Sequence, residues 1–319
     1  MDEMKLIALY CYLCECYTTH LRWQVQRFSN NSEPKFTDVE VLTIYLFAIM
    51  EEDKRHVSQI HRHAAKYLRS WFPLLPTYKV YVHRLNRLAD CLPLLIERLR
   101  ADCPCRRVRE GIRRVRERIR RVREGILLLD SMPTCAPWRI VTCSHKRAGQ
   151  VAPNLTGKGL CPSKNLFYYG CKLHSVNDSA PARMPLPVYV ELTAASEHDL
   201  TVVRPTLARL HNATLMAHKI YCDKLLNTHL EQNQNCSILT PVKLVKGQCQ
   251  RLREFDKAAN DLFSTYVAGF RQPIESFFNW LQEKTRIQQA SQVRSENGLL
   301  VHVFGKLAAA LASLVFIST

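Results

Sequence analysis

Short apolar runs of strand length follow one another after residue 126, and this succession constrains the fold more than any other feature of the chain. The strand-like segments span residues 126–130, 139–143, 166–174, 188–193, 215–223 and 236–240. Helical signals lie among and after them, at residues 196–210, 273–289 and 299–317, and residues 146–165 read as a loop. This order of strands and helices predicts an α/β fold with a mixed sheet.

The first hundred residues have a different pattern, which is helical. Thr37 and Glu40 form a capping box in front of an apolar run, and further helices are predicted at residues 56–71 and 78–99. Basic side chains define a candidate nucleic-acid face: Arg55, His61, His63, Lys66, Arg69, Lys79, Arg84 and Arg87. A solvated helical surface is the plainer interpretation, and the charge of the chain favours DNA or RNA contact slightly over it.

A tandem repeat separates the two patterns. Three arginine-rich heptads, RRVREGI, RRVRERI and RRVREGI, run from residue 106 to residue 126 and look like a slippage duplication. We therefore predict a helical DNA-binding domain at 1–105, a heptad linker at 106–124 and a catalytic domain at 125–319, with a polar helical insertion at 243–269. The net charge of +17 stays basic without two of the heptads and indicates a polyanionic partner.

Three carboxylates carry the candidate chemistry. Asp130 and Asp223 end two predicted strands, and Glu275 lies on a late helix. Hard oxygen ligands of this kind suit Mg²⁺ or Mn²⁺, and two such ions clamp the attacking and leaving oxygens of a phosphoryl transfer. Each carboxylate alone is more simply a turn or surface residue, but the three together favour a metal site.

The residues around these carboxylates resemble a known family, the bacterial insertion-sequence transposases of the DDE type, which have an RNase H-like catalytic domain. The resemblance covers residues 36–317 in order. It rests on LLLDSMP at Asp130, YYGCKLH at 168–174, LTAASEHD ending at Asp199, YCDK at Asp223, RQPIESFFNWLQEKTRIQQASQVRS around Glu275, and FGKLAAA at 304–310.

This resemblance implies an enzyme that binds the terminal inverted repeats of its element and catalyses DNA strand cleavage and strand transfer. It implies that Asp130, Asp223 and Glu275 hold two Mg²⁺ or Mn²⁺ ions. It also implies double-stranded DNA as partner, at both element ends and target, and a homodimer or higher synaptic assembly. Two alternatives stay open, a catalytically inactive DNA-binding copy and an RNase H-like nuclease.

Several neighbours of the carboxylates are candidates for DNA contact. Arg271 lies four residues before Glu275 on the same helix face, where it can pair with the glutamate or hold a phosphate. Further candidates are Lys172, Lys224, Lys284 and Arg286. His198 and Asp199 are interpreted equally well as support for the site or as a helix cap. Leu225 and Leu226 stand where the family pattern predicts a small and then an aromatic residue, which favours the inactive alternative.

Composition sets the expected compartment. Thirteen scattered cysteines, an odd number, suit a reducing cytoplasm, and the acidic start of the chain does not read as a secretory signal. The apolar runs at 41–50 and 307–317 are shorter than a membrane span and are predicted to be buried helices. We therefore expect a cytoplasmic protein without a membrane partner, and the family resemblance implies that it is bacterial and associated with the nucleoid.

Overall fold

The structure is a computed structural model that describes residues 2–27, 34–103, 126–133, 152–161, 166–179, 184–242 and 247–316. It divides into two compact units. The first comprises Met1–Gly111, Val141–Pro153 and Trp280–Thr319, and the second comprises Ile112–Ile140 and Asn154–Asn279. The arginine-rich heptads and the strand predicted at 139–143 lie outside the described residues.

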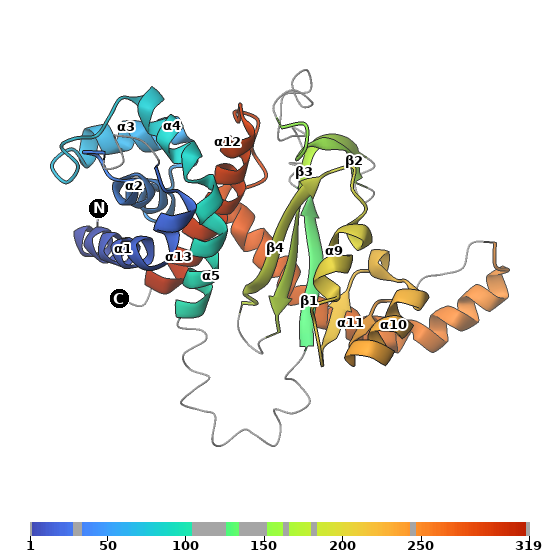
Figure 1. Ribbon diagram of the computed structural model, residues 1–319. Coiled ribbons are helices and arrows are strands. Elements are labelled where there is room, and N and C mark those ends of the chain that lie inside the picture. Colours follow the sequence, from blue (N-terminus) through green and yellow to red (C-terminus); the bar gives the residue numbers. More distant parts are fainter. Residues whose placement is uncertain are drawn as a thin grey trace, which may run out of the picture. The chain divides into compact units, whose positions relative to one another are not determined.

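Helices form the first unit (Figure 1). They are α1 (Glu3–Cys16), η1 (Tyr17–Leu21), η2 (Arg22–Gln24), α2 (Asp38–Met50), α3 (Val57–Tyr67), α4 (Tyr78–Arg87), η3 (Ala89–Cys91), α5 (Leu92–Asp102), α12 (Glu296–Leu300), η6 (Val301–Gly305) and α13 (Lys306–Phe316). The C-terminal helix α13 packs against α2 and α5, so both ends of the chain share one core. The sequence grouped these last helices with the catalytic domain, whereas they pack with the N-terminal ones.

Close approach of two helices explains one glycine of the FGKLAAA motif. The hydroxyl of Tyr45 on α2 donates to the Val301 carbonyl at 3.2 Å. A Cβ atom at Gly305 would lie 2.7 Å from the Tyr45 ring, closer than side chains tolerate. Gly305 therefore lets the last helical segment approach α2.

The last helical run extends beyond the apolar segment at 307–317 and begins at Glu296. Glu296–Phe316 has the length and mean hydropathy of a membrane-spanning helix, but 78% of its most apolar window is buried inside the protein. A core helix passes the same test of length and composition, so the run is weak evidence for a membrane span. The burial agrees with the prediction of a buried helix here.

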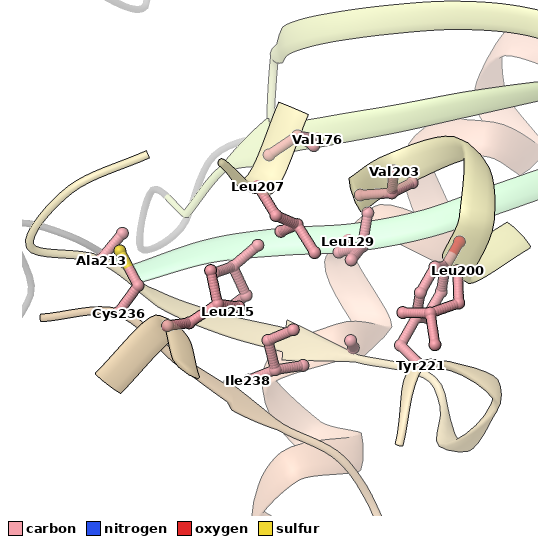
Figure 2. Close-up of a cluster of buried hydrophobic side chains, with 12 residues drawn as sticks. Leu129, Val176, Leu200, Val203, Leu207, Ala213, Leu215, Tyr221, Cys236 and Ile238 are labelled. Atoms are coloured by element: carbon pink, nitrogen blue, oxygen red, sulfur yellow. The ribbon is translucent and has the colours of Figure 1, made fainter. Parts of the chain in front are cut away.

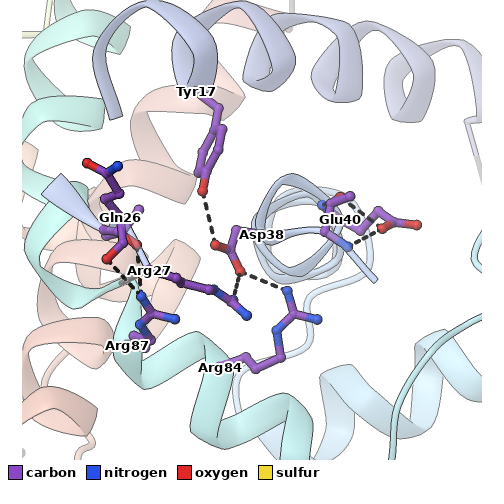
Figure 3. Close-up of polar contacts among 9 residues, drawn as sticks. Tyr17, Gln26, Arg27, Asp38, Glu40, Arg84 and Arg87 are labelled. Atoms are coloured by element: carbon purple, nitrogen blue, oxygen red, sulfur yellow. Dashed lines mark hydrogen bonds and ion pairs between the residues drawn. The ribbon is translucent and has the colours of Figure 1, made fainter. Parts of the chain in front are cut away.

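The capping box at the start of α2 is confirmed. The Thr37 side chain accepts from the Glu40 backbone N–H at 3.2 Å, and the Glu40 carboxylate accepts from the Thr37 backbone N–H. Asp38, the first residue of the helix, is buried and accepts hydrogen bonds from Tyr17, Arg27 and Arg84 (Figure 3).

This arrangement changes the predicted basic face. Arg84 is buried in its ion pair with Asp38, and Arg87 donates to the carbonyls of Val25 and Gln26 (Figure 3). Of the eight basic residues proposed for nucleic-acid contact, these two hold helices together instead. The reason is that α4 turns one side toward α2, so part of its basic surface faces the protein interior.

A mixed six-stranded sheet forms the second unit, as the sequence predicted. Its elements are β1 (Ile126–Pro133), β2 (Gly157–Cys161), β3 (Leu166–Asp178), β4 (Pro187–Ala194), α9 (Asp199–Leu207), β5 (Thr214–Ala217), η5 (Lys219–Tyr221), α10 (Lys224–Gln234), β6 (Ser237–Leu239) and α11 (Gln250–Thr285). The strand order is β2-β3-β1-β5-β6, with β4 on β3. Strand β1 is central: it runs parallel to β5 and antiparallel to β3.

One face of this sheet is closed by helices. Leu129 of β1, Leu215 of β5 and Ile238 of β6 form a buried cluster with Leu200, Val203 and Leu207 of α9 and Leu230 of α10 (Figure 2). Apolar side chains from both layers thus fix α9 and α10 against β1. This packing determines what the neighbouring polar residues of β1 can reach.

The structure corrects four sequence predictions. Strand β2 lies within the predicted loop, because its glycines hide the strand pattern: a Cβ at Gly159 would lie 2.8 Å from Ala195. Strand β1 continues past Asp130, so this residue lies inside the strand. Strand β5 ends at Ala217, six residues before Asp223. Helix α11 starts long before Pro273 and passes through it.

Candidate active site

The pleat of β1 sends its successive side chains to opposite faces of the sheet. Leu129 belongs to the cluster under α9, and Ser131, two residues on, donates to Asp199 of α9 at 2.9 Å. Asp130 therefore points to the other face, where it meets α11. The two faces carry two separate polar groups, one around Asp130 and one around Asp199.

Arg271 joins Asp130 to Glu275. One terminal nitrogen, Nη2, lies 2.9 Å from an Asp130 carboxylate oxygen and 3.3 Å from a Glu275 oxygen. The Arg271 side chain is 8% exposed and that of Asp130 is 16% exposed, whereas the Glu275 side chain is 58% exposed. The i, i+4 spacing that the sequence showed thus gives a pair on one helix face, and the tertiary structure adds the second carboxylate.

Burial and charge shift the pKa of the Asp130 carboxyl in opposite directions. Burial raises the pKa of the Asp130 carboxyl, while the positive charge of Arg271 and the backbone N–H of Ser131 lower it, with a net rise. The carboxylate therefore depends on a neighbouring cation for its negative charge. Removal of that cation would favour the protonated acid.

His218 is a site neighbour that the sequence reasoning missed. Ala217 is paired with Leu129 in parallel register, so His218 follows at the level of Asp130. Burial lowers the pKa of His218 and Arg271 lowers it further, while Asp130 opposes this effect. The only sequence signal was its position directly after a strand that adjoins the strand of Asp130.

Asp223 has a different set of partners. It is the N-cap of α10, where one carboxylate oxygen accepts from the Leu226 backbone N–H at 3.1 Å. The other oxygen is 2.8 Å from Arg204 of α9. The structure thus brings Asp130 and Glu275 together on Arg271 and holds Asp223 on Arg204. The convergence of all three carboxylates stays a prediction.

A second polar group lies on the α9 face of the sheet. Asp199 is buried and accepts hydrogen bonds from Ser131 Oγ at 2.9 Å and Lys172 Nζ at 2.8 Å. His174, two residues beyond Lys172 and on the same face, contacts Thr193 at 2.8 Å, and burial lowers its pKa to about 4. Asp199 therefore connects α9 to β1 and β3, at the strand residue that follows Asp130.

This geometry separates the two interpretations of the His198–Asp199 pair. His198 caps α9 by accepting from the Leu200 backbone N–H at 3.3 Å. Asp199 instead supports the strand that bears Asp130. The ammonium of Lys172 is held by Asp199 and the Glu197 carbonyl, so any contact of Lys172 with DNA would have to compete with these bonds.

The other candidates for DNA contact differ in their surroundings. Lys224 and Lys284 are exposed at the first turn of α10 and the last turn of α11. Arg286 has a left-handed backbone, with a φ of 52°, and its carbonyl accepts from Lys306 at 3.2 Å. Their roles toward DNA stay predictions.

The donor chemistry of the site fits a hard divalent cation, because Asp130 and Glu275 offer carboxylate oxygens. In the structure a guanidinium stands between them. Within the described ranges, no group of three or more His, Cys, Asp or Glu side chains is arranged to hold a metal ion. Two of the three predicted carboxylates, Asp130 and Glu275, therefore have the ligand type that a divalent cation prefers and lie close to one another.

The fold and the site together define an α/β protein that has a mixed sheet and an acidic centre between its central strand and a long helix. The chain belongs to the transposase DDE domain family, whose match covers residues 140–312. This match includes Asp223, Arg271 and Glu275, and it begins ten residues after Asp130. It confirms the predicted family. Comparison with curated proteins and with solved structures gave no match.

Proposed function

We propose that this protein is a transposase that cleaves the ends of an insertion sequence and joins them to target DNA in a reaction dependent on divalent cations. The observation that carries the proposal is the meeting of Asp130 and Glu275 on Arg271, in a chain of the DDE family. The cleavage frees a 3′-hydroxyl, which then attacks the target strand. No covalent enzyme intermediate is needed.

Asp130, Asp223 and Glu275 are the proposed ligands of two Mg²⁺ or Mn²⁺ ions. Such ions supply electrostatic stabilisation of the attacking and leaving oxygens in a phosphoryl transfer. Asp199 is a positioning residue in this proposal, because its hydrogen bond to Ser131 fixes the strand on which Asp130 lies. Arg204 has the corresponding role for Asp223 through their 2.8 Å ion pair.

Double-stranded DNA is the proposed partner, as element end and as target. Arg271 has a guanidinium suited to a phosphate once the carboxylates have bound a cation. The proposed DNA path further includes Lys172, Lys224, Lys284 and Arg286, and the N-terminal helices would bind the inverted repeats. We further propose a homodimer or higher synaptic assembly and a place in the bacterial cytoplasm, at the nucleoid.

The inactive DNA-binding copy is the second candidate, and one observation favours it. Leu225, at a position where the family pattern predicts a small residue, is 86% exposed beside Asp223. An exposed leucine next to a proposed ligand is unusual for a surface meant to meet DNA. The RNase H-like nuclease remains a third candidate with the same ligands.

A strand-transfer assay separates the three candidates. DNA bearing the element ends is incubated with the protein, a target plasmid and Mg²⁺ or Mn²⁺. A transposase gives joined products from ends with a free 3′-hydroxyl, and a nuclease gives cleavage alone. DNA binding without either product supports the inactive copy and contradicts our proposal.

A further inference from the structure

The N-terminal half of α11 carries an exposed apolar stripe. Figure 1 shows this half as a long helix whose end reaches beyond the sheet. The stripe consists of Leu252, Phe255, Leu262, Phe263 and Tyr266, which are 53%, 71%, 83%, 40% and 52% exposed. Large contiguous apolar surfaces on soluble proteins mark interaction sites. The stripe therefore needs an occupant.

The stripe is a distinct face of the helix. Its residues lie within about a third of the helix circumference, as the 3.6-residue period requires. Val267 lies on an adjoining face and is fully buried, so the helix is anchored there. The charged residues Arg253, Lys257 and Asp261 fall on the side away from the stripe. The helix thus packs on its own chain through the face that bears Val267 and leaves the apolar stripe exposed.

The spacing of the stripe is that of a coiled-coil seam. Leu252 and Phe255 occupy the a and d positions of one heptad, and Leu262 occupies the d position of the next, in which residue 259 is the a position. Tyr266 occupies the a position that follows these two heptads. In a parallel two-stranded coiled coil, the g residue, which precedes an a position, faces an e residue of the partner helix. That e residue lies five positions later in the sequence. Here these two residues are Arg251 and Asp256, which have opposite charges.

We propose that this stripe binds the same stripe of a second copy of the chain, with the two α11 helices parallel around a two-fold axis. The two-fold makes the contact self-complementary and forms two Arg251–Asp256 pairs. Among the residues that the structure describes, neither side chain has an ion pair within its own chain. Asp256 accepts a hydrogen bond from Gln248 and remains available on its other oxygen. This surface deepens the proposed function by naming the contact of the homodimer, and it stands whether or not the acidic centre cuts DNA.

The helix is already folded and anchored, so pairing costs little ordering entropy. Two heptads give a short seam of about 20 Å, which predicts a dimer that dissociates on dilution. The relevant measurement is sedimentation velocity of the full chain over a range of micromolar concentrations.

The first test is Leu262→Glu, with Leu225→Glu as the matched control. Leu262 and Leu225 are similarly exposed, 83% and 86%, but Leu225 lies on α10 outside the stripe. We expect the dimer dissociation constant to rise at least about tenfold for Leu262→Glu and to stay unchanged for Leu225→Glu. A parent protein that is monomeric at every concentration, or equal effects of both variants, would overturn the proposal.

The second test is a charge exchange that addresses the direction of the helices. Arg251→Glu alone and Asp256→Arg alone each place like charges opposite one another and should weaken the dimer. The double variant restores opposite charges and should dimerise like the parent. In an antiparallel pair over the same stripe, residues 251 and 256 of one copy would lie opposite the far end of the partner's stripe and would not meet each other. Failure of the double variant to restore dimerisation would therefore contradict the parallel arrangement.

Discussion

Arg271 is the residue whose replacement gives the sharpest information on the candidate site. It neutralises the partly buried Asp130 and also reaches Glu275. Loss of one member of a buried pair leaves an uncompensated charge, so Arg271→Gln should lower the free energy of unfolding by about 3 kcal/mol. Urea denaturation without divalent cations measures this loss. Arg271→Lys keeps the charge and should lose less.

The same variant tests the cation. Arg271 occupies the carboxylates that the proposal assigns to Mg²⁺ or Mn²⁺, so Arg271→Gln should be stabilised more by added Mn²⁺ than the parent, by mass action. If Mn²⁺ stabilises neither protein, Asp130 and Glu275 are not metal ligands. If it stabilises only the parent, Arg271 helps to form the site and does not compete with the ion.

Glu275→Gln tests the reaction itself. The substitution keeps the volume of the side chain and removes the negative charge that a divalent cation requires. We expect DNA cleavage and joining to fall below detection while DNA binding persists. The Glu275 side chain is 58% exposed, so folding should be little affected. Unchanged strand transfer by this variant would remove Glu275 from the proposed ligands.

Lys306 predicts a dependence of stability on pH. Its side chain is buried on α13, and burial, with the charge of Arg55, lowers its pKa to about 7. Between pH 7 and 10.5 the unfolded chain binds a proton that the folded chain does not, so stability should rise with pH. The slope approaches about 1.4 kcal/mol per pH unit. The difference between the parent and Lys306→Met in urea midpoint, measured at pH 7, 8 and 9, should shrink as the pH rises.

At the scale of elements, the start of α2 is determined locally. Thr37→Ala should destabilise the protein by about 1 kcal/mol, because the Glu40 backbone N–H loses its acceptor. Thr37→Ser keeps the hydroxyl and should stay within a few tenths of the parent value. Thermal or urea denaturation of both variants checks this. An equal loss in both would indicate that the threonine methyl group, rather than the cap, carries the effect.

Helix α11 shows where local signals fail. Proline lacks the N–H that would bond to the Gly269 carbonyl, and the sequence therefore predicted a helix that starts at Pro273. The helix nevertheless continues from Gln250 to Thr285, because Val267, Ile274 and Phe277 are buried on both sides of the proline. Packing of one continuous apolar face outweighs a single missing hydrogen bond.

At the scale of the whole molecule, the packing of both chain ends matters for experiments on DNA binding. Helix α13 contributes to the core that α2 and α5 share, so a fragment limited to residues 1–103 would expose that core. The recognition of the inverted repeats is therefore to be measured on the full chain. Binding should weaken steeply with salt, since counterion release dominates association with DNA. A flat salt dependence would contradict a phosphate-binding surface.

The heptad repeat gives a further prediction at this scale. Deletion of residues 106–119 removes two of the three copies, and the third still leads into β1. We expect the melting temperature to stay within a few degrees of the parent value, because we predict that these copies form no part of a core. The salt dependence of DNA binding should become less steep if their arginines contact phosphates. A large fall in melting temperature would show that the repeat is structural.

Much of this protein follows from its sequence alone. The alternation of short apolar runs and helical segments predicted the α/β fold and its mixed sheet, because periodicity reports burial locally. The capping box of α2 and the pair of Arg271 with Glu275 were predicted for the same reason, since their partners lie three or four residues apart. The family was also recognised from motifs along the chain, as the match over 140–312 confirms.

Only the tertiary structure decided the contacts between distant segments. It showed that Asp130 contacts Arg271 across 141 positions of sequence and that Asp223 pairs with Arg204. It also placed His218 beside the acidic centre. It also turned Arg84 from a candidate for DNA contact into the partner of Asp38. Side-chain type and spacing fix which partners are chemically possible, but the choice among distant partners depends on which apolar faces pack together.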